Sequence, residues 1–214
     1  MGSVDRIAGS LGSESSEQRG QTATMVQPMT TRHRLSTEAA RLFAERGYHG
    51  TSMGDLAEAL GIRKASIYSH IEGKEDLLAE IALAGASAFH LALDEMPDDV
   101  EPLERLRLAL RAHLNVVDRQ LDVAMVWLHE WRYLADPARE RFVGERRRYE
   151  RRIRDLFEAA IRNGDLRAEL DVKRAVLVFL SVANWGYTWM IPGTDAAREA
   201  DAFWPLLLGG IGSR

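Results

Sequence analysis

Apolar residues recur with a helical period along most of the chain, and no segment alternates convincingly between apolar and polar residues as a strand would. Glycine, proline and asparagine residues interrupt the pattern where helices would end. The predicted helices cover residues 35–46, 53–60, 63–70, 74–93, 103–118, 121–134, 139–162, 172–190 and 195–208. The pattern therefore predicts an all-α protein.

The first three predicted helices are short and closely spaced. Thr51 or Ser52 can cap the second helix, and Gly61 allows a tight turn at its end. In the third helix, Ile67 and Ile71 are four residues apart and can anchor the helix inward, so that its polar side chains face outward. This arrangement is typical of a DNA-binding helix-turn-helix.

The helix-turn-helix resembles that of the tetracycline-repressor-like (TetR-type) transcriptional regulators. The motifs that carry the resemblance are Gly47-Tyr48, Thr51, Gly61-Ile62, Tyr68, His70 and Lys74-Glu75-Asp76-Leu77-Leu78. Arg63, Ala65 and Ile71 stand where that family often has Ser, Gly and Phe, so the base preference of a relative does not transfer. The resemblance implies an N-terminal three-helix DNA-binding head over residues 29–76. It also implies a C-terminal helical-bundle body over residues 77–214, for ligand binding and dimerisation.

If the third helix enters the major groove of double-stranded DNA, the candidate DNA-binding residues form two groups. Residues 64–66 would lie near base edges, while the other candidates would contact phosphates or add positive charge beside the DNA. The candidate DNA-binding residues are Thr51, Arg63, Lys64, Ala65, Ser66, Tyr68, His70 and Lys74.

The formal net charge of −4, from 28 basic and 32 acidic residues, is unusual for a DNA-binding protein, but the charge is unevenly distributed. Between Arg32 and Glu75 there are seven basic and six acidic residues, so the acidity lies elsewhere. Non-specific affinity for DNA comes from many phosphate contacts. A weakly positive head on an acidic body therefore favours a selective DNA-binding protein.

Six arginines between residues 146 and 154 raise the alternative of a second nucleic-acid surface. They are interleaved with Glu145, Glu150 and Asp155 at helical spacing, which favours an exposed face of salt bridges. A third interpretation is that one or two of these arginines hold the phosphates of a ligand.

Residues 1–28 are rich in Ser, Gly, Gln and Glu without hydrophobic periodicity, and are predicted to be a disordered tail. No apolar segment of signal-peptide length follows the first residues, so a cytoplasmic location is expected. The apolar run from Ala175 to Ile191 is only 17 residues long and contains Ser181 and Asn184. It is predicted to be a buried helix and not a membrane span.

The helix at 172–190 is apolar on nearly all sides and needs cover on all sides, which a chain of this size cannot supply alone. The family resemblance implies that it pairs with the helix at 139–162 and with both helices of a second copy. The sequence thus predicts a homodimer whose operator is an inverted repeat.

Two aromatic clusters raise the question of a ligand. The candidate ligand-binding residues are Trp127, Glu130, Trp131, Asn184, Trp185 and Trp189. Aromatic residues at helical spacing are usually core or dimer interface, but a large apolar pocket with a few polar groups is also the usual form of a small-molecule site. The segments that carry these clusters, residues 127–132 and 184–189, look like those of TetR-type regulators of fatty-acid and sterol breakdown. This resemblance implies a small hydrophobic effector, with an acyl-coenzyme A thioester preferred.

Catalysis has little support. The chain has no cysteine, which excludes disulfides and cysteine nucleophiles, and its six histidines show no metal-ligand spacing. No catalytic residue, metal site or cofactor is therefore expected. The sequence predicts a dimeric, ligand-responsive transcriptional repressor. The alternatives are an enzyme or carrier that uses the helical body, and an architectural DNA-binding protein without an effector.

Overall fold

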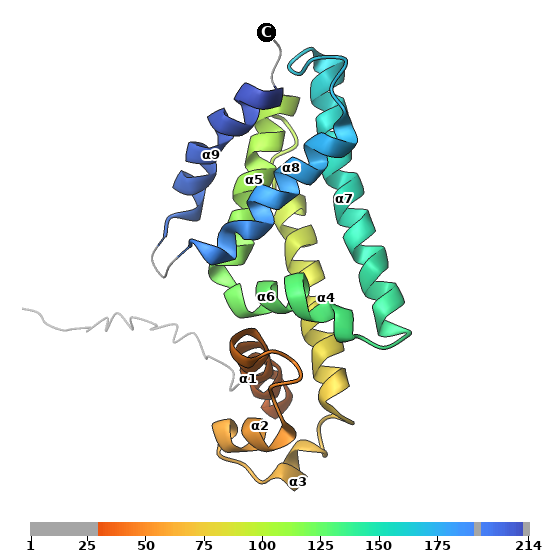
Figure 1. Cartoon of the computed structure of the whole chain (residues 1–214), viewed down its shortest axis with the longest axis vertical. Coiled ribbons are helices and arrows are strands. Elements are labelled where there is room, and N and C mark those ends of the chain that lie inside the picture. The colour runs from red at the N-terminus through yellow and green to blue at the C-terminus, as the bar shows by residue number, and fades with distance from the viewer. Residues whose placement is uncertain (1–29, 191–193, 212–214) are drawn as a thin grey trace, which may run out of the picture.

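A computed structural model describes residues 30–190 and 194–211, and all regular structure within them is helical. The α-helices are α1 (Thr31–Arg46), α2 (Met53–Leu60), α3 (Lys64–Ile67), α4 (Lys74–Asp94), α5 (Pro102–Arg119), α6 (Leu121–His129), α7 (Ala138–Asn163), α8 (Val172–Asn184) and α9 (Ala196–Ile211) (Figure 1). Two 3-10 helices, η1 (Glu130–Tyr133) and η2 (Trp185–Thr188), follow α6 and α8. The predicted all-α fold is confirmed, and the tail predicted at 1–28 lies outside the described residues.

Local signals place the helices of the head where the sequence predicts them. Ser52 caps α2, because its hydroxyl accepts from the amides of Gly54 and Asp55 while the Asp55 carboxylate accepts from the Ser52 amide over 2.6 Å. Gly61 ends α2 in the left-handed region, with a φ of 65°. Ile67 and Ile71 are buried, as predicted, while α3 ends at Ile67, earlier than expected.

The helix α4 connects the head to the body. Its first turns pack beside α1, and its later turns pack beside α5, α6 and α7 (Figure 1). The predicted boundary at residues 76–77 falls within the first turn of this helix. By length and composition alone α4 is apolar enough to cross a membrane, but half of its most apolar window is buried inside the protein. Such burial is what the core helix of a folded domain requires.

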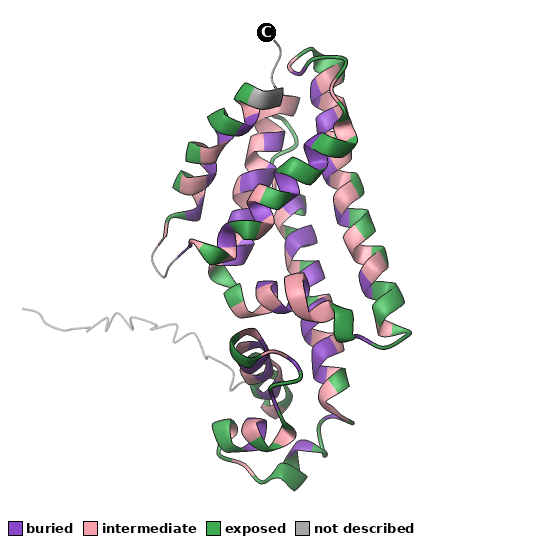
Figure 2. Ribbon diagram, in the orientation of Figure 1, coloured by how far each residue is buried: buried purple, intermediate pink, exposed green. Residues whose placement is uncertain are grey.

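The body is built around α5, which packs against α4, α7, α8 and α9. Its buried side chains recur at helical spacing and are Leu106, Ala109, Leu110, His113, Leu114, Val116 and Val117. On the other side, Arg107 and Arg111 each donate to the Asp201 carboxylate and thereby fasten α9 to α5. Figure 2 shows the buried positions of the body turned inward along these helices.

The structure corrects the prediction of one helix over residues 172–190. The α-helix ends at Asn184, and η2 follows it at a tighter pitch. Gly186 approaches α5 so closely that a Cβ atom there would lie 2.8 Å from Cδ2 of Leu114. Within the single chain, α8 is also not buried on all sides, since Leu177 and Val178 are exposed.

Candidate functional site

The surface formed by α3 and the turn after it carries most of the predicted DNA-binding side chains. Ile67 is fully buried and holds α3 against the head. The exposed candidates are Arg63, Lys64, Ala65, Ser66, Tyr68 and His70. They lie at the end of the molecule farthest from the body (Figures 1 and 2). This surface is therefore open to a groove of double-stranded DNA.

Two predicted phosphate contacts are engaged inside the protein instead. Thr51 is 1% exposed, and its hydroxyl donates towards the carbonyl oxygens of Leu42 and Gly47, each 3.1 Å away. Nζ of Lys74 donates to the carbonyl oxygens of Tyr48 and Thr51 over 2.7 and 2.8 Å. In this structure both side chains hold the head together. The buried Thr51 hydroxyl is out of reach of a phosphate, whereas a phosphate contact of the half-buried Lys74 stays a prediction.

Glu130, predicted as a ligand-binding residue, contacts the head. Its Oε2 atom accepts from the amide N–H of Tyr48 over 2.7 Å. A carboxylate on a backbone N–H forms a charge-assisted hydrogen bond, which is stronger than a neutral one. Glu130 thus joins η1 to the loop that follows α1, and its contact with a ligand stays a prediction.

Trp127 and Trp131 lie in an aromatic cluster inside the body. Trp127 is 3% exposed, and its ring centroid is 4.4 Å from that of Phe89. Trp131 stacks on Phe142 with centroids 5.5 Å apart. The guanidinium carbon of Arg146 lies 5.1 Å from the Trp131 ring and 5.5 Å from the Trp127 ring. These contacts place the two tryptophans in one environment.

Arg146 differs from the other arginines of α7. Arg148 pairs with Glu145, and Arg152 donates to Asp94 over 2.6 Å, as predicted for an exposed charged face. Arg146 instead turns inward towards the two tryptophan rings and forms no ion pair with any described residue. Burial lowers its pKa, and Glu150 only partly opposes this shift. A half-buried guanidinium that is compensated only in part by Glu150 favours an anionic ligand group nearby.

Several polar side-chain atoms are buried in the body without a hydrogen-bond partner of normal geometry. They are Nε2 of His113, Nε1 of Trp127, Nε2 of His129 and Oδ1 of Asn184, none of which has a hydrogen-bond partner among the described residues. An unpaired buried polar group costs about 1–3 kcal/mol. His113 and Asn184 nevertheless interact through their side chains, because Asn184 raises the pKa of His113. Nε1 of Trp127 and Nε2 of His129 therefore remain as the groups that the described part of the body leaves unused.

His113 is the most deeply buried of these groups. Its Nδ1 atom lies 2.9 Å from the hydroxyl oxygen of Tyr149, and both side chains are almost completely buried. Burial lowers the pKa of His113 to about 3, and a side-chain interaction with Asn184 opposes this shift. Burial also raises the pKa of Tyr149. Both groups are thus neutral at physiological pH.

His113, Tyr149 and Arg146 were not among the predicted ligand residues. His113 could have been found, because it falls on the apolar face of α5 at helical spacing with Leu110 and Leu114. Arg146 could not, because it stands in a run of arginines that the sequence does not distinguish.

The remaining predicted ligand residues do not all join the cluster. Asn184 faces His113, as its effect on the pKa of that residue shows. Trp189 packs against Phe203 of α9, with ring centroids 5.1 Å apart. Trp185 is 60% exposed at the end of α8, so in the single chain it lies on the surface and not in the aromatic interior.

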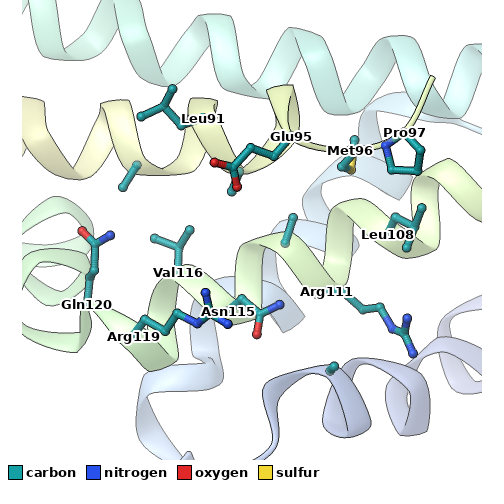
Figure 3. Close-up of a pocket in the computed structure, with 14 residues that line it drawn as sticks. Leu91, Glu95, Met96, Pro97, Leu108, Arg111, Asn115, Val116, Arg119 and Gln120 are labelled. Atoms are coloured by element: carbon teal, nitrogen blue, oxygen red, sulfur yellow. The ribbon is translucent and has the colours of Figure 1, made fainter. Parts of the chain in front are cut away.

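A separate groove of about 490 Å³ lies between α4, α5 and α9 (Figure 3). None of the predicted ligand residues lines it. Its apolar wall includes Leu108 and Val116, and its polar residues include Glu95 and Arg119. Arg111 lines the groove as well, but Asp201 pairs with it, so the charges of Glu95 and Arg119 remain and are opposite. The groove therefore has no clear preference for an anionic ligand, and we do not place an effector there.

Comparisons with known proteins match both parts of the chain. Residues 36–81 match the model of bacterial regulatory proteins of the tetR family, and residues 99–211 match the tetracyclin repressor-like C-terminal domain. The transcriptional repressor KstR2 of Mycolicibacterium smegmatis is 27% identical over 193 residues, covering 88% of this chain and 94% of the relative.

Two solved structures are similar over most of their length. PfmR, a TetR family transcriptional regulator from Thermus thermophilus, is 32% identical with a TM-score of 0.75, covering 82% of this chain and 97% of its own. AibR, solved in complex with isovaleryl coenzyme A and operator DNA, is 30% identical with a TM-score of 0.74, covering 82% of this chain and 96% of its own.

The burial of His113 predicts acid sensitivity. Its pKa of about 3 in the folded chain lies below the value of about 6.5 expected in the unfolded chain. Below pH 6.5 only the unfolded chain takes up this proton, so stability falls as the pH falls towards 3. Between pH 6.5 and 5 the free energy of unfolding should lose about 2 kcal/mol through this residue. For His113→Gln, the free energy of unfolding measured by urea denaturation should fall by about 2 kcal/mol less over the same pH range than it does for the unsubstituted protein. An unchanged pH dependence would contradict the assignment.

Proposed function

The chain belongs to the TetR family of bacterial regulatory proteins, and from this premise we propose that it is a cytoplasmic transcriptional repressor that binds an inverted-repeat operator as a homodimer. A small hydrophobic effector, preferably an acyl-coenzyme A thioester, would release it from DNA. The family and the similar proteins are transcriptional regulators and not enzymes, so the alternative of an enzyme is set aside.

The observation that carries this proposal is the exposed surface of α3. Lys64 and Ser66 lie at the start of this helix, where a recognition helix presents its side chains to base edges. Arg63 and His70 flank them and are exposed as well. The inward anchors, Ile67 and Ile71, fix which side of the helix faces outward. A helix held in this way supports selective reading of DNA.

An apolar surface on α8 supports the dimer. Leu177 and Val178 are 58% and 50% exposed, and Trp185, two turns farther along, is 60% exposed. Leu177 and Val178 are adjacent on the exposed side of α8, and Trp185 follows the end of the helix. Large exposed apolar side chains that lie near one another are typical of a protein interface. A second copy related by a twofold axis would cover it and would place the two heads on two half-sites.

The aromatic cluster of the body supports the proposal that the body binds an effector. Trp127 and Trp131 supply apolar surface, while Arg146 and the unpaired atoms of Trp127 and His129 supply polar groups. The similarity to AibR, whose structure contains isovaleryl coenzyme A and operator DNA, points to a thioester. The acyl part would lie among the aromatic rings, and the phosphates would lie near the arginines of α7.

The DNA-binding surface predicts two different kinds of mutational effect. Lys64→Ala and Ser66→Ala should change the order of preference among operator variants, because these side chains face base edges. Arg63→Ala should weaken operator and random DNA alike and should lower the slope of log affinity against log salt by about one unit. Gel-shift titrations at several salt concentrations measure both effects. If Lys64→Ala and Ser66→Ala weaken the affinity for all operator variants equally, these side chains do not read bases.

The exposed face of α8 predicts a charge-sensitive interface. Val178→Glu would place a carboxylate in the apolar contact, so the purified protein should be monomeric or insoluble and should lose tight operator binding. Analytical ultracentrifugation measures the oligomeric state. Ala202→Glu adds the same charge at an exposed position of α9 and serves as the control. A well-folded dimer of Val178→Glu would move the interface elsewhere.

The effector proposal predicts an order of potency in release from operator DNA. A hundredfold change in DNA affinity requires about 2.7 kcal/mol of coupling, which lies in the usual allosteric range. Burial of an acyl chain provides about 0.8 kcal/mol per methylene, so a chain of several carbons suffices. Titration of the repressor–operator complex with straight-chain thioesters, the matching free acids and coenzyme A alone should show release by the thioesters at the lowest concentration. Release by the free acids at equal concentration, or by none of the series, would exclude the thioester.

A further inference from the structure

A set of contacts centred on Tyr48 joins the head to the body in addition to the continuous helix α4. Tyr48 lies in the loop between α1 and α2 and is 6% exposed. Its amide N–H donates to Oε2 of Glu130, in η1, over 2.7 Å. Its carbonyl oxygen accepts from Nζ of Lys74, the first residue of α4, over 2.7 Å. Both backbone polar groups of this one residue are thus occupied by side chains from other elements.

The ring of Tyr48 takes part in the same contacts. It stacks on the ring of Tyr133, with centroids 5.8 Å apart and an angle of 18° between the planes. Nζ of Lys74 lies 4.0 Å from the centroid of the Tyr48 ring. We refer to Tyr48, Lys74, Glu130 and Tyr133 together as the Tyr48 junction. It brings η1, α4 and the head into contact at one place.

The geometry of η1 connects this junction to the aromatic cluster. A 3-10 helix has three residues per turn, so Glu130 and Tyr133 lie on one side while Trp131 points elsewhere. Glu130 and Tyr133 contact the head, whereas Trp131 stacks on Phe142 and lies beside Arg146. Four consecutive residues therefore contact both the head and the proposed effector environment. Figure 1 shows α6, which leads into η1, lying next to α1.

We propose that Glu130 is a positioning residue, which fixes the angle between head and body through the amide of Tyr48 and transmits a rearrangement of η1 to the head. If Trp131 moves to admit a ligand, Glu130 moves with it. The Tyr48 amide must then follow the carboxylate or remain buried without a partner, which is unfavourable. The head thus changes its angle together with η1. The regulatory part of this inference rests on the proposed function, whereas the positional part does not.

The positional part is tested on the whole chain without DNA or effector. The chain has no native cysteine, so Glu58→Cys on α2 and Arg151→Cys on α7, both exposed, accept one spin label each. Labelled chains are diluted with unlabelled chains, so that distances within one chain dominate. Double electron–electron resonance then gives the distribution of head-to-body distances.

Removal of the acceptor should release the head. Glu130→Ala should broaden or shift the distance distribution, whereas Glu130→Gln, which keeps a side-chain carbonyl oxygen at the same reach, should stay close to the unsubstituted chain. Glu140→Ala removes an exposed carboxylate of α7 and is the matched control, with no change expected. If Glu130→Ala does not fold, Glu130→Asp, which is one methylene shorter, takes its place with the same expected broadening. An unchanged distribution in the folded variant would overturn the proposal and leave α4 and the packing of α1 on α6 to set the angle.

The regulatory part is measured as a ratio of operator affinities with and without octanoyl-coenzyme A as the probe. In Glu130→Ala, or in Glu130→Asp where that variant takes its place, this ratio should fall by about tenfold, equivalent to about 1.4 kcal/mol of coupling. Glu130→Gln should keep most of the ratio, because it also keeps the acceptor for the Tyr48 amide. An equal ratio in all variants would overturn the transmission through Glu130. Failure of the probe to release the unsubstituted protein would instead contradict the proposed effector, and the distance measurement would still decide the positional claim.

Discussion

The helix α4 has to satisfy two hydrophobic cores at once, and the arrangement of the other elements depends on this requirement. Leu77 and Leu78 in its first turns and Phe89 and Leu93 in its last turns are all at most 1% exposed. Each such side chain contributes about 1.5–3 kcal/mol when it is buried. Neither end can therefore leave its core without a large loss of stability. A change in the packing of the body can reach the head as a movement of the whole helix.

A single helix would leave the head free to swing about its end, and the packing of α1 on α6 together with the contacts of η1 restricts that freedom. Lys74 stands at the point where the two attachments meet, since its ammonium group binds the loop that Glu130 also binds. Lys74 also ties this loop to Thr51, just before α2. The conformation and position of the head therefore depend on polar contacts with backbone groups as well as on its apolar core. These contacts are directional, which gives the head one preferred angle.

The fold was predictable from the sequence because its signals are local. The capping box of Ser52 and Asp55 and the glycines that end α2 and α7, with φ of 65° and 85°, act within a few residues. The roles of Lys74 and Glu130 were not predictable in the same way. Their partners lie 26 and 82 residues away from them, and they are backbone groups, which look the same at every position of a sequence. Only the tertiary structure shows which loop these side chains reach.

The interior of the body departs from an ordinary hydrophobic core, and the departure has a physical consequence. The buried His113 ring, the indole N–H of Trp127 and the desolvated Arg146 would each be replaced by apolar groups if stability alone were required. Their retention lowers the stability of the empty body. A bound molecule that pairs them recovers this free energy, and it stabilises the folded body in proportion to the logarithm of its concentration. If the proposed effector pairs these polar groups, the stability of the body depends on the effector, as the proposed ligand-controlled regulation requires.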